Sequence, residues 1–209
     1  MTVLQLPEIA LRGRDVQLRP LTPDDVPALA AASGESREHY LYSPVPDGLQ
    51  STAAYVERAL DARARGQRYP FTIIWRERIV GTTSYSEYQP WEWPVRSEHA
   101  RSDRPNSAEV GYTWLAASAQ RTTCNTEAKL LLFAHAFEQW QVHSVCLRTD
   151  ARNQRSRRAI ERVGATFEGI RRAHSAGADG TVRSSAFFSI IAEEWPSVRQ
   201  RLQKLLDRG

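Results

Sequence analysis

One stretch of the chain constrains its fold most: residues 108–140 pass from a strand pattern through a short polar loop into an amphipathic helix. Residues 108–115 alternate in polarity, as a strand with one buried face does. The helix that follows places its apolar side chains three and four positions apart, the spacing of a buried helical face. These side chains are Leu130, Phe133, Ala134, Phe137 and Trp140. A strand and helix joined this closely predict a sheet with helices packed on it.

The rest of the chain supplies the partners of this unit. The sequence predicts strands at 15–21, 69–75, 78–88, 144–149, 166–174 and 183–191, and helices at 22–33, 51–66, 153–163 and from about 193. Residues 34–50 and 89–107 lack periodicity and are expected to be loops. The order is β-α-α-β-β-β-α-β-α-β-β-α. It predicts an α/β (α+β) fold with a single mixed, mostly antiparallel central sheet flanked by helices, in one domain that spans residues 1–209.

Composition narrows the function classes. The apolar share is 41%, and no apolar run reaches about 18 residues, so no membrane-spanning helix is expected. The N-terminus is too polar for a signal peptide, which makes the cytoplasm the expected location. Two cysteines outside a C-x-x-C pair and five scattered histidines predict no metal site. The net charge of +4 is compatible with nucleic acid, with an anionic cofactor or simply with a solvated surface. Because net charge describes a field rather than a fold, nucleic acid is not the expected partner. A homodimer is left open.

The loop between the strand and the helix has the character of an anion site. The first N–H groups of a helix are unpaired, and the helix dipole favours negative charge there. Arg121 adds a fixed cation, and Thr122, Thr123 and Thr126 add hydroxyl donors. A diphosphate would suit this loop. The alternative is a loop that caps its helix and binds nothing.

Four segments, in order, resemble the GNAT superfamily of N-acetyltransferases, and within it the RimJ/RimL-like group. They are Glu109 to Leu115, Gln120 to Ala128, Thr149 to Ala165, and Phe167 to Arg172 with Arg183 and the Glu194-Trp195-Pro196 tail. The resemblance implies a fold that splays two central strands apart so that acetyl-coenzyme A lies between them. It also implies transfer of the acetyl group to a primary amine.

The resemblance also implies which residues hold the cofactor. Trp114 and Leu115 would pair with the pantetheine through their main chain and polarise the thioester carbonyl, Asn153 would hydrogen-bond the cofactor, and Arg158 would meet an adenosine phosphate. The pyrophosphate would lie on the loop formed by Gln120, Arg121, Thr122, Thr123, Cys124, Asn125 and Thr126.

This loop departs from the family pattern at two positions. The family has Gly at the position of Thr123 and Gly or Ala at the position of Asn125. Asn tolerates a left-handed backbone, whereas a β-branched residue resists it. The sequence therefore predicts a loop of altered shape around Thr123.

Acetyl transfer to an amine needs a base for the amine and a proton for the leaving sulfur. Glu109 is the candidate base, since partial burial raises the pKa of a carboxyl; the alternative is a carboxylate simply paired with an arginine. The resemblance implies Ser156 as the acid, since Ile160 stands where many relatives carry a tyrosine and Ser156 lies at the serine position of the RimJ/RimL-like group; the alternative is a serine bonded to its own helix. His174 is a second possible base or a substrate contact, but a surface histidine at the end of a strand is the favoured interpretation. Cys124 is expected to pack rather than react.

The acceptor amine is expected to meet aromatic side chains. Tyr40 and Tyr42 in one loop, and Trp91 and Trp93 in the other, are the candidate substrate-binding residues. The acceptors to consider are a protein N-terminus, a small amine and an aminoglycoside-like amine. Direct attack in a ternary complex is the expected mechanism. The rival hypothesis is a coenzyme A-binding sensor module without catalysis.

Overall fold

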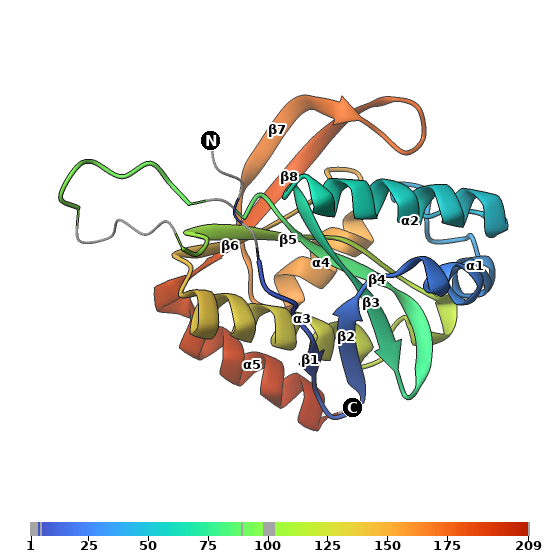
Figure 1. Ribbon diagram of the computed structural model, residues 1–209, viewed down its shortest axis with the longest axis horizontal. Coiled ribbons are helices and arrows are strands. Elements are labelled where there is room, and N and C mark those ends of the chain that lie inside the picture. Colours follow the sequence, from blue (N-terminus) through green and yellow to red (C-terminus); the bar gives the residue numbers. More distant parts are fainter. Residues whose placement is uncertain (1–3, 5, 89, 98–102, 209) are drawn as a thin grey trace.

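The computed structural model describes residues 4, 6–88, 90–97 and 103–208. Within them, strands in the order β1-β2-β3-β4-β5-β6-β8-β7 form one sheet (Figure 1). The strands are β1 (Leu11–Arg12), β2 (Val16–Pro20), β3 (Arg68–Trp75), β4 (Arg78–Ser86), β5 (Ser107–Leu115), β6 (Ser144–Asp150), β7 (Thr166–Ala176) and β8 (Val182–Ile191). Neighbouring strands are antiparallel except β5 and β6. The predicted mixed, mostly antiparallel sheet is therefore confirmed; β1 was missed, because two residues are too few to show alternation.

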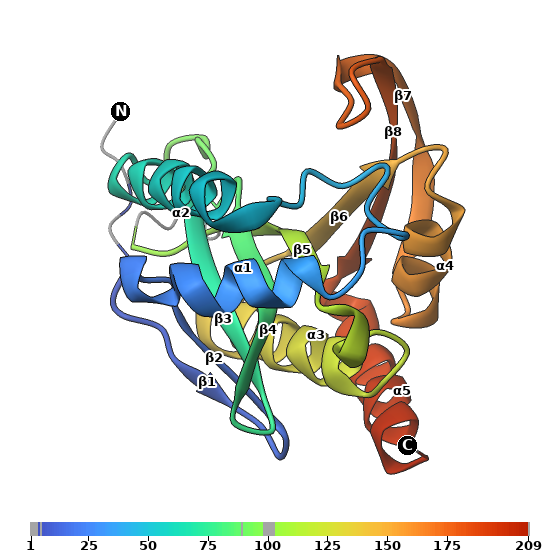
Figure 2. The same ribbon diagram turned by 90° about the vertical axis from the view of Figure 1, so that its right-hand side faces the viewer.

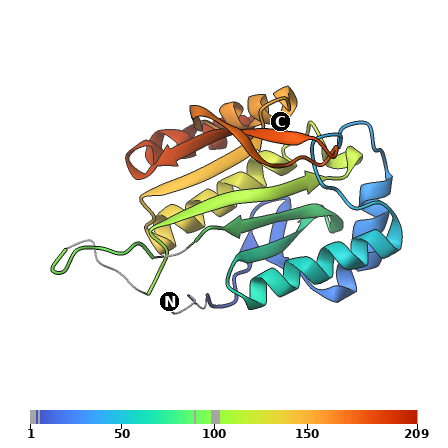
Figure 3. The same cartoon turned by 90° about the horizontal axis from the view of Figure 1, so that it is seen from above.

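Helices cover both faces of this sheet. They are α1 (Val26–Gly34), α2 (Gly48–Ala64), α3 (Cys124–Ala134), α4 (Gln154–Arg162) and α5 (Trp195–Asp207), with a π-helical turn at His135–Trp140 and 3-10 turns at Pro23–Asp25, Ala117–Ala119 and Ala192–Glu194. Helices α1 and α2 pack on β3 and β4 from one face, while α3 and α5 lie on the other and α4 lies beside β6 (Figures 2 and 3). Buried side chains from these elements form one hydrophobic cluster.

The parallel pair β5–β6 is joined over a short length only. Its register runs from Ser107 opposite Ser144 to Glu109 opposite Cys146. Beyond Glu109, β5 continues to Leu115 beside β4, and β6 continues to Asp150 beside β8. The two strands therefore diverge, and the sheet opens between them.

The start of α2 differs from the sequence prediction. Helix α2 begins at Gly48 rather than near Ser51, because the Ser51 hydroxyl lies in the first turn and accepts a hydrogen bond from the Asp47 N–H (3.3 Å). In α5, Leu202 and Leu206 are both buried, since positions four apart stay on one helical face.

Candidate active site

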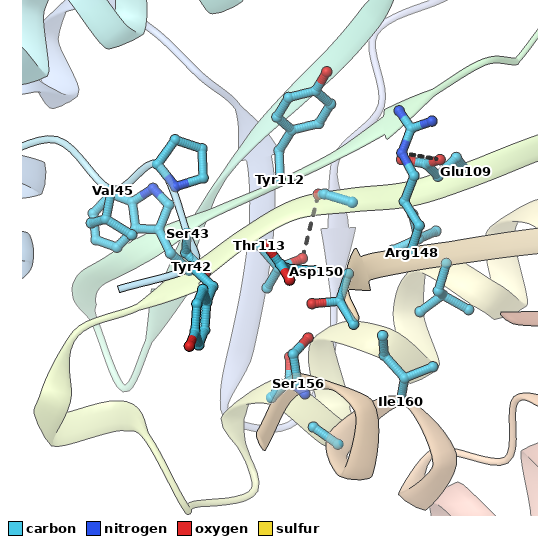
Figure 4. Close-up of a pocket in the computed structure, with 18 of the residues that line it drawn as sticks. Tyr42, Ser43, Val45, Glu109, Tyr112, Thr113, Arg148, Asp150, Ser156 and Ile160 are labelled. Carbon is cyan, nitrogen blue, oxygen red and sulfur yellow. Dashed lines mark hydrogen bonds and ion pairs between the residues drawn. The ribbon is translucent and has the colours of Figure 1, made fainter. Parts of the chain in front are cut away.

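A cavity of about 520 Å³ fills the opening between β5 and β6 (Figure 4). Tyr42, Ser43 and Val45 approach it from the α1–α2 loop, and Ser156 and Ile160 approach it from α4. Its remaining lining comes mainly from β5 (Glu109 to Trp114), β6 (Leu147 to Asp150), α3 (Asn125 and Lys129) and the β7–β8 hairpin (His174, Ser175 and Arg183). The divergence of two strands has thus brought six separate stretches of sequence around one space.

Glu109 is buried at the point where the two strands part, with 4% of its surface exposed. Its Oε2 lies 3.0 Å from Arg148 Nε, and its Oε1 accepts a hydrogen bond from Ser86 Oγ (3.4 Å). Burial raises the pKa of the Glu109 carboxyl to about 7, although the Arg148 guanidinium acts to lower it. The carboxylate is therefore both paired with an arginine and able to exchange a proton near neutral pH.

Arg148 was not singled out from the sequence, yet it shapes the electrostatics of this corner. Its Nη1 lies 3.0 Å from Glu87 Oε1 while its Nε contacts Glu109. One guanidinium thus spans two carboxylates from neighbouring strand ends. The sequence feature that could have identified Arg148 is its position on β6, the strand next to the one that carries Glu109.

Strand β5 is distorted just past Glu109. Its register against β4 shifts between Thr82 opposite Trp114 and Ser84 opposite Gly111. Tyr112, at the shift, has a left-handed backbone with a φ of 51°. A bulge of this kind redirects main-chain groups, and here it does so in the part of β5 that lines the cavity.

Lys129 enters the cavity from α3 and was also not predicted as a site residue. It is 6% exposed, and its Nζ donates a hydrogen bond to Thr113 Oγ1 (2.7 Å). Burial lowers the pKa of its ammonium group to about 7.

The candidate cofactor loop has a different conformation from the one its sequence suggested. Thr123 is the N-cap of α3 and has an ordinary right-handed φ of −71°. The left-handed residue is Arg121, with a φ of 60°. Thr123 therefore does not have to adopt a left-handed backbone, and the residue that does lies two positions earlier in the loop. Asn125 and Thr126 lie in the first turn of α3, and the Thr122 hydroxyl accepts a hydrogen bond from the Cys124 N–H (3.2 Å).

Cys124 is fully buried at the start of α3. Burial raises the pKa of its thiol to about 12, far from the range of a reactive thiolate. This is the environment of a packing residue, as expected.

The end of β5 is tied to the cofactor loop and to the α1–α2 loop. The Leu115 carbonyl accepts hydrogen bonds from Tyr40 Oη and from Gln120 Nε2, each at 2.7 Å. Arg155 Nη2 in turn donates to Gln120 Oε1 (2.7 Å). Trp114 is buried, and its indole N–H has no hydrogen-bond partner within the described part of the chain. The strand end thus offers an unmet donor beside the cavity.

Helix α4 presents the other predicted cofactor and acid residues. Asn153 caps the helix, with its Oδ1 accepting from the Ser156 N–H (3.0 Å). Ser156 is half-buried and lines the cavity, whereas Arg158 is exposed on the helix surface.

The four predicted acceptor residues fall in three different places. Tyr42 lines the cavity, and the Arg152 guanidinium lies 4.8 Å from the centre of its ring. Tyr40 is buried against Leu115 instead. Trp91 and Trp93 pack on each other and on His143, and the Trp91 indole donates to Ser107 Oγ (3.3 Å).

The two tryptophans therefore lie at the start of β5, away from the residues that line the cavity. The part of their segment that the structure describes extends outward from the sheet (Figure 1); residues 89 and 98–102 of the predicted excursion lie outside the described ranges.

The β7–β8 hairpin contributes further groups that sequence reasoning undervalued. His174 lines the cavity rather than the outer surface, with Nδ1 2.9 Å from Ser185 Oγ. Arg183 lies beside it, and burial lowers the pKa of its guanidinium. Arg152 links this hairpin to β6, because it contacts both Asp150 Oδ2 (2.7 Å) and Asp179 Oδ2 (2.9 Å).

A second cavity, of about 420 Å³, lies on the other side of the cofactor loop. It is lined by Trp75, Arg76, Arg121, Thr122, Thr123, Arg162, Leu205 and Arg208. The loop is therefore flanked by positive charge on this side. Over the described ranges, no cluster of three or more His, Cys, Asp or Glu side chains is arranged to hold a metal ion. No helix in the described residues is long and apolar enough to cross a membrane.

The fold and the cavity together define an acyltransferase, and the comparisons with known proteins agree. The model of the acetyltransferase (GNAT) domain matches residues 15–166. The chain therefore belongs to the GNAT family and is an acetyltransferase; enzymes with this fold use acetyl-coenzyme A.

Solved structures extend the likeness of fold over nearly the whole chain. A GCN5-related N-acetyltransferase from Brucella melitensis is 24% identical, with a TM-score of 0.80 over 96% of this chain and 86% of that one. RimJ of Mycobacterium smegmatis, in complex with CoA-disulfide, is 23% identical, with a TM-score of 0.73 over 95% and 93%. RimL, a ribosomal alpha-N-protein acetyltransferase, is 18% identical, with a TM-score of 0.71 over 88% and 94%. A search of the curated proteins gives no match.

Proposed function

We propose that this enzyme transfers the acetyl group of acetyl-coenzyme A to a primary amine by direct attack within a ternary complex. The observation that carries the proposal is Glu109, a buried carboxyl with a pKa of about 7 at the vertex of the cavity. A base poised near neutral pH is what removal of a proton from an attacking amine requires.

The groups around the opening suit the cosubstrate. The N-terminus of α3, with Thr122, Thr123, Cys124, Asn125, Thr126 and the cation of Arg121, would hold the pyrophosphate. The unpartnered indole N–H of Trp114 supports a polar ligand at the end of β5. Gln120 and Asn153 flank the same region from the loop and from α4. Arg158, being exposed, is available to an adenosine phosphate at the rim.

The chain's own residues then divide the chemistry. Glu109 takes the proton from the amine nitrogen as the nitrogen attacks the thioester carbonyl. Main-chain N–H groups of β5 near Trp114 and Leu115 stabilise the oxygen as it gains negative charge. Ser156 lines the cavity from α4 and is one candidate donor of the proton to sulfur.

The acceptor would enter past Tyr42 and Asp150, which line the cavity from the α1–α2 loop and from the end of β6. The Asp150 carboxylate is held by Arg152, which also lies over the Tyr42 ring, so the aromatic ring is the feature of this entrance that suits an amine with some apolar body, such as a protein N-terminus or a small amine. Trp91 and Trp93 lie too far along β5 to support a role at this entrance.

Binding and turnover together test the proposal. Acetyl-coenzyme A at about 100 times its Kd stabilises a protein by about 2.7 kcal/mol, which for a chain of this size raises Tm by about 5–10 °C. We expect such a shift, and we expect acetylation of at least one member of a panel of peptide N-termini, polyamines and aminoglycosides.

Glu109→Gln is the matched control, because it keeps the shape of the side chain and removes the base. The variant should keep the thermal shift and lose turnover. A thermal shift without acetylation of any amine by the wild type would favour the coenzyme A sensor instead, and no shift would contradict both.

A further inference from the structure

The buried amine of Lys129 has no role in the chemistry described so far. It lies in the first half of α3, four residues beyond Asn125, and lines the same cavity as Glu109 and Ser156. Its Nζ is fixed on Thr113 Oγ1 at 2.7 Å, and that hydroxyl is held by Thr83 Oγ1 at 2.8 Å. Thr113 belongs to the distorted part of β5. The amine is therefore held in place at the floor of the opening.

The surroundings of Lys129 leave its charge uncompensated. The titratable side chains that line the same cavity are Tyr42, Tyr55, Glu109, Tyr112, Arg148, Asp150, His174 and Arg183. Their carboxylates are engaged elsewhere, Glu109 with Arg148 and Asp150 with Arg152. Among the described residues, no ion pair includes Lys129. An ammonium group in such a place is costly unless an anion arrives beside it.

Acetyl transfer would produce one such anion in this cavity, because the sulfur of coenzyme A gains negative charge as its bond to carbon breaks. We infer that Lys129, rather than Ser156, gives the proton that this sulfur takes up. The inference rests on the proposed acetyl transfer and assigns a further catalytic residue to it.

The step balances without any other reactant. The amine nitrogen bonds to the thioester carbon and passes one proton to the Glu109 carboxylate. The carbon–sulfur bond breaks, its electron pair goes to sulfur, and the Lys129 ammonium gives one proton to that sulfur. Lys129 then regains a proton from solvent, and Glu109 releases one, so the products are an acetylated amine and a thiol.

The acidity of the two candidates decides between them. An alkyl thiol has a pKa of about 8.5, and burial lowers the pKa of the Lys129 ammonium to about 7, so this group can protonate a thiolate. A serine hydroxyl is a much weaker acid than a thiol, and the helix arginines and Asn153 around Ser156 suit it better to positioning the cofactor. Thr113 keeps the Lys129 amine oriented in either protonation state, because its hydroxyl can donate or accept.

The first experiment measures the pKa of the coenzyme A thiol directly. Coenzyme A is bound to the protein, and its thiol is titrated by the ultraviolet absorbance of the thiolate, in the wild type, Lys129→Met and Lys204→Met. Lys204 is the only other lysine in the chain and is exposed on α5, so it is the matched control. An ammonium beside the sulfur should lower the thiol pKa by about one pH unit relative to Lys129→Met, which keeps the thiol a weaker acid than the Lys129 ammonium, and Lys204→Met should match the wild type.

The pH profile of turnover gives the second readout. Loss of a general acid should reduce kcat on the order of 10²-fold and remove the alkaline limb of the profile in Lys129→Met. Ser156→Ala should keep that limb. Lys129→Gln, which can still donate to Thr113 but is not an acid, guards against a folding defect and should behave as Lys129→Met does.

The possible failures are distinguishable. If the wild type does not bind acetyl-coenzyme A, the proposed function fails together with this inference. If the wild type acetylates an amine but the thiol titration is the same in Lys129→Met, only the role of Lys129 is overturned. Loss of the alkaline limb in Ser156→Ala alone, or an acetyl group found on Lys129 after turnover, would also overturn it.

Discussion

Replacing Lys129 by Met should stabilise the protein, and the gain should depend on pH. Burial moves the pKa of this ammonium from 10.5 to about 7, which at about 1.4 kcal/mol per pH unit corresponds to about 5 kcal/mol. The native state thus holds this proton more weakly than the unfolded chain does. The cost is complete below about pH 7, shrinks as the pH rises, and is gone above the pKa of the unfolded chain. Met has a similar length, fits an apolar site and carries no charge.

The assay is denaturant unfolding of Lys129→Met and the wild type at a series of pH values. We expect the variant to be more stable by up to about 5 kcal/mol near pH 6, and by about 2 kcal/mol near pH 9. Lys204→Met, on the exposed face of α5, should differ from the wild type by less than about 0.5 kcal/mol throughout. A difference between Lys129→Met and the wild type that does not change with pH would refute the reasoning, as would a variant less stable than the wild type at every pH.

Three further predictions concern activity, stability and the cofactor loop. Turnover by the wild type should fall as the pH drops through the Glu109 pKa of about 7. In Glu109→Gln this fall at acid pH should disappear, and kcat/KM should be lower by about 10²-fold. If the variant shows the same fall at acid pH, another group is the base. Tyr40→Phe removes a hydrogen bond to the Leu115 carbonyl, so the free energy of unfolding measured in denaturant should fall by about 1 kcal/mol, and an unchanged stability would contradict this. Arg121→Gly relieves the left-handed backbone and should raise unfolding stability by up to about 1 kcal/mol, while calorimetry shows weaker coenzyme A binding; equal affinity would mean that this cation does not meet the phosphates.

The order of elements could be predicted because each element carries its own pattern. Strand β5 alternates, α3 has a stripe of apolar residues, and α4 is bounded by the Asn153 cap and by Gly164. Local sequence patterns do not indicate which strands are neighbours in the sheet. The parting of β5 from β6 after Glu109 depends on the whole sheet, so it entered the prediction only through the resemblance to a family.

The site was predicted where a residue's role follows from its position along one element, and missed where it follows from contacts between elements. The sequence could place Glu109 at the cavity because this residue stands on the central strand; its role as a base stays a prediction. Arg148 was not, because its partners come from two other strand ends. Tyr40 and Tyr42 are two residues apart in one loop, yet one is buried against Leu115 and the other lines the cavity. Nothing in the local sequence separates them.

Lys129 shows how such a residue can be recognised. The apolar stripe of α3 includes Phe133, and the position four residues before it is Lys129. Continuing the stripe toward the N-terminus therefore places a lysine on the buried face, and its burial in the structure bears this out. A charged residue on a buried stripe breaks the local pattern, and such breaks are expected at functional sites.

A cavity that contains both Glu109 and Lys129 loses folding stability twice, because each is a buried ionisable group, and their pKa values suggest why both are kept. Burial raises the pKa of the carboxyl and lowers that of the ammonium, so both lie at about 7. Had the two side chains formed an ion pair with each other, each would be held in its charged form, and neither could exchange a proton near neutral pH. Arg148 pairs with Glu109 but does not offset the effect of burial on the Glu109 pKa, and the hydroxyl of Thr113 holds Lys129 without a charge. This separation leaves one group able to accept a proton and the other able to give one within the same space. The stability that Lys129→Met would recover is therefore the cost of keeping a proton available at a buried site.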